Sequence, residues 1–132
     1  MRVDIKKTVL LAAMVCGSNV WAGDVYVIAN AGVGLSGDEV RDVFVGEKQL
    51  AGSVKLVPLD NASAQADFLA KVMKIEAAKY NTVWSKKSFR DGVNPPPVRS
   101  GDAEVINAVK NTPGAVGYVS KAPADVKVIQ KY

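Results

Sequence analysis

The sequence contains no histidine, and its single cysteine, Cys16, lies close to the N-terminus. Without histidine, a serine–histidine–aspartate triad cannot form, and the imidazole and paired thiolate ligands of a typical zinc site are missing. No nucleophile stands beside an evident base, so only chemistry by carboxylates such as Asp60 and Asp67 is left for an enzyme. We therefore expect a binding protein rather than an enzyme, with no cofactor and no metal.

The first 22 residues are typical of a secretory signal. A positively charged start precedes the apolar stretch Thr8–Cys16, and Val20-Trp21-Ala22 supplies small residues at the two positions that a signal peptidase reads. The apolar stretch is about half as long as the roughly 20 residues of a membrane-spanning helix, and an uncut N-terminal anchor is the alternative. We predict a signal over residues 1–22, cleavage before Gly23, export to the periplasm, and one domain over residues 23–132.

Basic and acidic side chains nearly balance in the predicted mature chain. Of 17 basic and 13 acidic residues, three and one lie in the signal, which leaves 14 against 12 and a net charge of +2. This small excess is not the footprint of a nucleic-acid-binding protein, so we expect no nucleic-acid partner. A weak positive field would still favour small anions over cations.

Short β-rich runs alternate with helical segments along the mature chain, and this alternation predicts an α/β layer fold. Pro58 indicates a strand end or an edge strand, and Gly117 indicates that another part of the protein packs closely against its strand. The predicted strands are Val25–Ala29, Val54–Leu59, Ala115–Val119 and Val126–Ile129.

Helices are predicted between these strands. Ser36 and Glu39 form a capping box before a brief helix that Gly46 ends. The longest helix is predicted from Asp60 to about Lys79, where apolar residues follow the spacing of one buried face. The other expectations are an irregular segment at Tyr80 and Trp84, an extended connector at Pro95-Pro96-Pro97, and a third helix that Ser100 or Asp102 caps and that ends in a turn at Asn111–Gly114.

A glycine motif precedes the brief helix. Gly32-Val33-Gly34-Leu35-Ser36-Gly37 fits the G-x-G-x-x-G pattern of dinucleotide-binding proteins, and Asp60 follows the next strand as a ribose-binding acid would. The helix that it opens spans only about two turns, and about 110 residues barely supply one of the two halves that a dinucleotide site needs. We therefore interpret the motif as a flexible loop next to a capping serine.

The start of the predicted longest helix could receive an anion. Free backbone N–H groups and the helix dipole favour negative charge there, and Ala62 and Ala64 would let a small ion approach the amides. Side chains of Asn61, Ser63 and Gln65 could donate further hydrogen bonds. The alternative is ordinary capping by Asn61 or Ser63 with nothing bound, and the charge of the neighbouring aspartate would repel a dianion.

Taken in order, four segments resemble phosphate-binding proteins that feed ABC importers. The stretch Pro113–Val119, P-G-A-V-G-Y-V, is similar to the P-G-A-I-G-Y-V stretch of that group and is the most specific of the four. The other segments are Asp38–Gly46, which resembles a helix ending in I-F-x-G; Val57–Asp60 followed by Ser63 and Phe68, which resembles a strand leading to a phosphate-cradling helix; and Trp84 with Phe89 and Pro95-Pro96, which resembles a segment of short members.

This resemblance, which extends over about Val25 to Val119, implies a type 2 periplasmic-binding-protein fold. The mature length allows a single lobe, a mixed sheet flanked by helices, where the usual members have two lobes that close on the ligand. One lobe leaves an anion half in water, where hydrogen bonds contribute less. The family helix opens with a Gly-Ser-Gly-Thr type of motif, whereas this chain has Asn61-Ala62-Ser63-Ala64, so only Ser63 carries over.

Two functional hypotheses follow. The first is an oxyanion-binding protein, with phosphate as the ligand that the resemblance implies, working with an ABC importer or as a periplasmic sensor. Its predicted ligand-binding residues are Asn61, Ser63 and Gln65, with Asn30 and Ser36 completing the site.

The second hypothesis is an interaction module that has kept the fold and lost the ligand. Its exposed face would contact another envelope protein or a second copy of the chain in a homodimer. The candidate contact residues are Trp84, Phe89 and Pro95-Pro96-Pro97, although packing of a loop against its own domain is the explanation that we favour for them.

Overall fold

The computed structural model describes residues 23–132, and the predicted signal at residues 1–22 lies outside them. A four-stranded mixed sheet forms the centre of the fold. Its strands are β2 (Tyr26–Ala29), β5 (Val57–Pro58), β8 (Ala115–Val119) and β9 (Lys127–Lys131). Their order is β5-β8-β2-β9; β2 pairs antiparallel with β8 and β9, and β5 pairs parallel with β8.

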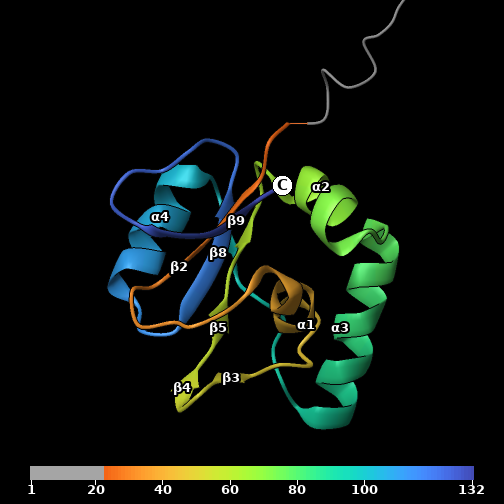
Figure 1. Ribbon diagram of the computed structural model, residues 1–132. Coiled ribbons are helices and arrows are strands. Elements are labelled where there is room, and N and C mark those ends of the chain that lie inside the picture. Colours follow the sequence, from red (N-terminus) through yellow and green to blue (C-terminus); the bar gives the residue numbers. More distant parts are fainter. Residues whose placement is uncertain (1–22) are drawn as a thin grey trace, which may run out of the picture.

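Helices cover both faces of this sheet (Figure 1). One helix, α4 (Asp102–Asn111), packs on one face. On the other side lie α1 (Val40–Phe44), α2 (Gln65–Phe68) and α3 (Ala77–Asp91). The expected mixed sheet flanked by helices is therefore confirmed.

The two faces of β8 supply two cores, because successive side chains of a strand point to opposite sides. Val116 and Tyr118 belong to the larger core, with the side chains of α1, α2 and α3. Ala115 and Val119 belong to a smaller core beneath α4. Gly117 lies between them, and a Cβ atom there would approach the Val105 side chain to 2.6 Å. The predicted close packing at this glycine is confirmed.

The longest helix lies elsewhere than predicted. Asp60 and Asn61 form a short strand, β6 (Asp60–Asn61), which pairs in parallel with β7 (Val98–Arg99). The helical part begins only with α2 and continues as a π-helical turn over Leu69–Met73. It ends at Lys74, whose backbone is left-handed with φ 57°. The predicted apolar face is nonetheless buried, because Phe68, Leu69, Val72 and Met73 all belong to the larger core.

The longest helix is α3, which the sequence patterns missed. Tyr80 and Trp84 were expected in an irregular segment, and both lie in this helix with their side chains buried. Their spacing of four residues places them on the same helix face, which packs against the core. The expected irregular segment is therefore corrected to a helix.

Several other boundaries also differ from expectation. The predicted strand Val54–Leu59 is divided into β4 (Val54–Lys55) and β5, and β4 forms a hairpin with β3 (Leu50–Ala51). The N-cap of α4 is Gly101, rather than Ser100 or Asp102. The capping box, in contrast, is confirmed: the Ser36 N–H donates to the Glu39 carboxylate at 3.0 Å.

Within residues 23–132, no helix has the length and apolar character needed to cross a membrane.

Candidate functional site

The turn between β6 and α2 is held together from inside by one buried side chain. Asn61 is fully buried, and its carbonyl Oδ1 accepts hydrogen bonds from the Ser63 N–H at 3.0 Å and the Ser63 hydroxyl at 2.8 Å. The N–H of Ala62 donates to the Arg99 carbonyl, and that of Ala64 to the Asn61 carbonyl. The amides of residues 62 to 64, expected to be bare, therefore all have partners in the protein.

A carboxylate of the protein itself completes this turn. Asp102, the first residue of α4, accepts a hydrogen bond from the Asn61 Nδ2 at 2.8 Å, and the Ser63 hydroxyl lies 3.5 Å away. Ser120, just after β8, donates its backbone N–H at 3.1 Å and its hydroxyl at 2.9 Å. The helix dipole also favours a negative charge in the first turn of α4. We call Asn61, Ser63 and Ser120, which surround this carboxylate, the Asp102 cradle.

A second carboxylate lies just behind the turn. Asp60 is 2% exposed, and its oxygens accept hydrogen bonds from the hydroxyls of Tyr118 at 2.7 Å and Tyr80 at 2.9 Å. Burial raises the pKa of Asp60 above its ordinary value, and the two hydrogen bonds only partly oppose this effect. Burial and the charge of Asp60 likewise raise the pKa of both tyrosines. Asp60 thus joins β6, β8 and α3 inside the fold.

The five predicted site residues do not form one site. The structure brings Asn61 and Ser63 together, and Gln65 lies close by, where it lines a cavity of about 430 Å³ with Asp60 and Tyr80. Asn30 lies near the opposite end of β8, because its N–H donates to the Ala115 carbonyl. In contrast, the Asn61 side chain donates to the Tyr118 carbonyl.

The side chains of Asn30 and Ser36 both have partners elsewhere in the fold. The Asn30 Nδ2 donates to the Val109 carbonyl at 2.9 Å, at the C-terminal end of α4. The hydroxyl of Ser36 lies 3.2 Å from the Glu39 carboxylate, within the capping box. Asn30 thus fastens a helix end, and Ser36 caps the turn before α1.

Asp102 and Ser120 were not identified as site residues from the sequence. Asp102 was expected only as a possible helix cap, and 41 residues separate it from Asn61. No local spacing indicates such a contact. The available signal was an acidic residue at a helix start and a serine directly after a buried strand, and both patterns also occur in ordinary caps.

A second cavity, which sequence reasoning also missed, lies on the other side of Trp84. It has a volume of about 360 Å³, and Trp84 contributes to its wall together with apolar and basic residues. We call it the Trp84 cavity. Its lining residues are Val43, Gly46, Lys48, Gln49, Lys55, Leu56, Pro58, Trp84, Gly92, Val93 and Asn94.

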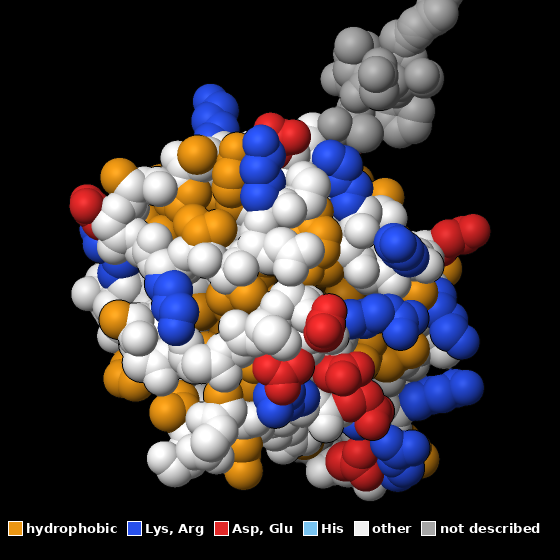
Figure 2. Space-filling model, viewed as in Figure 1, with side chains coloured by type: hydrophobic (Ala, Val, Ile, Leu, Met, Phe, Trp, Pro, Cys, Tyr) orange, Lys and Arg blue, Asp and Glu red, His pale blue; other side chains and the backbone are white. Residues whose placement is uncertain are grey.

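One face of the molecule carries charges of both signs. Figure 2 shows basic and acidic side chains interspersed over one face of the molecule. Among residues 23–132, no group of three or more carboxylate, thiol or imidazole side chains is placed to hold a metal ion.

Comparison with known proteins places the fold. No family model matches the chain, and no curated protein matches it in sequence. Among solved structures, the chain is similar to an ABC-type phosphate transport receptor from Vibrio cholerae, with a TM-score of 0.50 and 16% sequence identity. The match covers 83% of this chain and 47% of that receptor, so the chain spans about half the receptor's length. The described residues have a mixed α/β fold consistent with a single lobe of a periplasmic-binding-protein-like fold.

Proposed function

We propose that the chain is an exported protein that binds a small oxyanion, phosphate in the first place, at the Asp102 cradle. The observation that carries this proposal is that the cradle already holds an oxyanion group. Donors from two segments converge on one carboxylate, at distances of 2.8 Å from Asn61 and 2.9 Å and 3.1 Å from Ser120. These donors are of the kind that recognise phosphate and carboxylate oxygens alike.

A solute anion would have to replace Asp102 in this cradle. Ser63 is exposed and Asp102 is partly exposed, so solvent reaches the position. The tethered carboxylate competes at a high effective concentration, and its charge repels a second anion nearby. We therefore expect weak binding by the unaltered protein and a site that opens when the carboxylate moves away.

The context of this function is also a proposal. The signal pattern of residues 1–22 supports export to the periplasm. The similarity to a phosphate transport receptor supports a role in phosphate uptake or sensing, with an ABC importer as partner.

The test removes the competing carboxylate. Phosphate is titrated calorimetrically into the wild-type protein and into Asp102→Ala, and the melting temperature is followed in parallel. We expect the variant to bind phosphate at least about tenfold more tightly, with a corresponding rise in melting temperature. Adding Ser120→Ala to the variant should reduce the gain, because it removes the hydroxyl that donates to the cradle at 2.9 Å.

Asp42→Ala provides the matched control, because Asp42 is an exposed acid in the first turn of α1. If Asp102→Ala and Asp42→Ala respond to phosphate alike, the gain comes from net charge alone and the cradle is not an anion site. Should Asp102→Ala be too unstable, Asp102→Asn removes the charge while retaining the size of the side chain.

Two observations favour a second candidate, an interaction module without a ligand. The cradle is satisfied by the protein's own groups, and Phe89 on α3 is 95% exposed. Such a module would use its surface to contact an envelope protein or a second copy. Sedimentation of wild-type protein and Phe89→Ser would show this as a concentration-dependent association that the variant loses.

A further inference from the structure

The Trp84 cavity lies on the side of the sheet that carries the larger core, between four segments of the chain. These are the loop after α1, the β4–β5 segment, α3 and the loop after α3. Its volume of about 360 Å³ lies near the lower end of the range typical for small-molecule sites, roughly 300–1,000 Å³. A ligand of this cavity would therefore be small, such as a single ring or a short branched chain.

The inner wall of the cavity is apolar. Trp84 is 6% exposed and Leu56 is 5% exposed, and Val43, Pro58 and Val93 complete this part of the lining. The Trp84 indole N–H already donates to the Phe44 carbonyl at 2.9 Å. The indole therefore has no further donor to offer, and what it contributes to a ligand is an apolar, aromatic surface.

The remaining lining is polar and carries only positive charge. Lys48 and Lys55 both contribute to it, and no aspartate or glutamate does. Lys48 is paired with Glu39 at 3.2 Å. Lys55 has no ion pair among the residues that the structure describes, so its charge is available to a ligand. Gln49 and Asn94 add amide groups that can donate hydrogen bonds.

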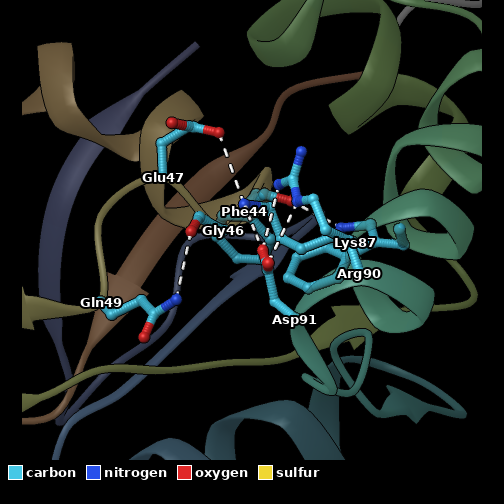
Figure 3. A network of polar contacts seen from close by, with 8 residues as sticks. Phe44, Gly46, Glu47, Gln49, Lys87, Arg90 and Asp91 are labelled. Carbon is cyan, nitrogen blue, oxygen red and sulfur yellow. Dashed lines mark hydrogen bonds and ion pairs between the residues drawn. The ribbon is translucent and has the colours of Figure 1, made fainter.

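One wall of the cavity is fixed by a network of polar contacts (Figure 3). Gly46 has φ 80°, and a Cβ atom there would approach Trp84 and Lys87 to within 2.9 Å. The amine of Lys87 pairs with Glu47 at 3.5 Å and with Asp91 at 3.9 Å. The Trp84 bond to the Phe44 carbonyl and the packing of the Lys87 stem against Gly46 also connect the loop after α1 to α3. The cavity is therefore formed before any ligand arrives, which lowers the cost of binding.

From this combination we propose that the Trp84 cavity is a second binding site, which takes a small organic anion with an apolar body, in the class of aromatic carboxylates. The apolar part packs on Trp84 and Leu56, and the carboxylate pairs with Lys55 at the rim. An amine of the same shape is rejected, because it would meet two lysines and no acid. The site shares no residue with the Asp102 cradle, so it does not depend on the proposed phosphate binding.

The test uses benzoate, the cation benzylamine of similar shape, and inorganic phosphate as probes. Each is titrated into protein purified from the periplasm, and the side-chain N–H signal of Trp84 is followed by NMR. Trp84→Phe identifies that signal by its loss. We expect benzoate to shift the signal saturably, and benzylamine and phosphate to leave it unchanged.

Variants of the lysine at the rim then measure how much its charge contributes to benzoate affinity, apart from the apolar surface. Lys55→Ala should weaken benzoate binding about two- to fivefold, the range of one partly exposed ion pair, and Lys55→Arg should restore it. Lys110→Ala is the matched control, because Lys110 is an exposed lysine that does not line this cavity. Ser63→Ala should also leave benzoate binding unchanged.

Three results would overturn this proposal. The first is a Trp84 signal that does not respond to benzoate. The second is an equal response to benzylamine, which would show an apolar hollow without charge selection. The third is a loss of affinity in Lys110→Ala as large as in Lys55→Ala, which would show a general effect of net charge.

Discussion

The hydroxyl of Tyr118 donates a hydrogen bond of 2.7 Å to the carboxylate of Asp60, and both residues are buried. This bond connects β8 to the segment that enters the Asn61–Ser63 turn. The aromatic ring of Tyr118 also stacks on Phe68 of α2 at a centroid distance of 3.8 Å. Asp60 therefore places a buried carboxyl group at the point where the sheet, α2 and α3 meet.

The buried carboxyl group of Asp60 predicts a specific dependence of stability on pH. Because burial raises its pKa in the folded state, Asp60 contributes most to stability below the ordinary pKa of an aspartate. That contribution is lost as the pH rises through the raised pKa. Wild-type protein should therefore lose stability relative to Asp60→Asn as the pH rises above the ordinary pKa of an aspartate, about 4. Urea unfolding of both proteins at a series of pH values from about 4 upward measures the difference.

A variant of opposite sign serves as the control. The hydrogen bond from Arg90 lowers the pKa of Asp91, so the contribution of Asp91 is present above the ordinary pKa and is lost as the pH falls. Wild-type protein should thus gain stability relative to Asp91→Asn as the pH rises. If wild-type protein keeps its stability relative to Asp60→Asn, or gains stability relative to it, as the pH rises, the account of Asp60 is contradicted.

Local signals in the sequence predicted much of the fold. The strand Ala115–Val119 and the capping box at Ser36 and Glu39 depend on neighbours within a few positions. The helix after Asp60 was misplaced because the pairing of β6 with β7 joins residues 38 positions apart, Asp60 with Val98. Nothing near Asp60 indicates that partner, and its apolar neighbours fit a helix equally well.

The candidate site was predictable only in part, for the same reason. Asn61 and Ser63 were identified because polar residues at a helix start are a local signal. Asp102 and Ser120 come close to Asn61 only because α4 and the end of β8 lie beside β6 in the folded protein. The sequence pattern does not reveal this arrangement. The left-handed residue Lys74 was equally hidden, since lysine rarely adopts that conformation.

Two glycines with similar backbone angles predict very different costs of substitution. Gly114 has φ 84°, and a Cβ atom there would clash with the Lys55 carbonyl oxygen. Gly52 has φ 63° with nothing within 4 Å. Gly52→Ala should cost about 1–2 kcal/mol from the backbone alone, and Gly114→Ala distinctly more because the β4–β5 segment must also move. Urea unfolding should rank the two losses of unfolding free energy in this order. Equal losses would show that the Lys55 segment can move aside without a cost in free energy.

The close packing of α4 on β8 predicts that a second substitution can rescue a first. Gly117→Ala would bring a methyl group to 2.6 Å from the Val105 side chain, so we expect a loss of about 1–3 kcal/mol in unfolding free energy. Val105→Ala alone leaves a cavity and is also destabilising. The double variant should be more stable than the sum of the two losses implies, because the new methyl group fills the space. Additive losses in urea unfolding would show that the two positions are independent.

The burial of Lys87 predicts that its aliphatic stem contributes more to the free energy of unfolding than its charge does. Its side chain is 10% exposed, whereas its partners Glu47 and Asp91 are 66% and 41% exposed and can be solvated without it. The stem packs at the position where Gly46 lacks a Cβ atom. Lys87→Met keeps the stem and should change the unfolding free energy by no more than about 1 kcal/mol, whereas Lys87→Ala should cost about 2 kcal/mol or more.

Lys86→Ala is the matched control, since Lys86 is the exposed neighbour on α3 and should change stability by less than about 0.5 kcal/mol. Thermal and urea unfolding of the four proteins give the comparison. If Lys87→Met is as damaging as Lys87→Ala, the ion pairs with Glu47 and Asp91 hold the loop to α3. The wall of the Trp84 cavity would then weaken at high salt, because screening reduces such pairs. If Lys87→Met is tolerated, packing of the stem holds the wall, and the cavity should keep its form over a wide range of ionic strength.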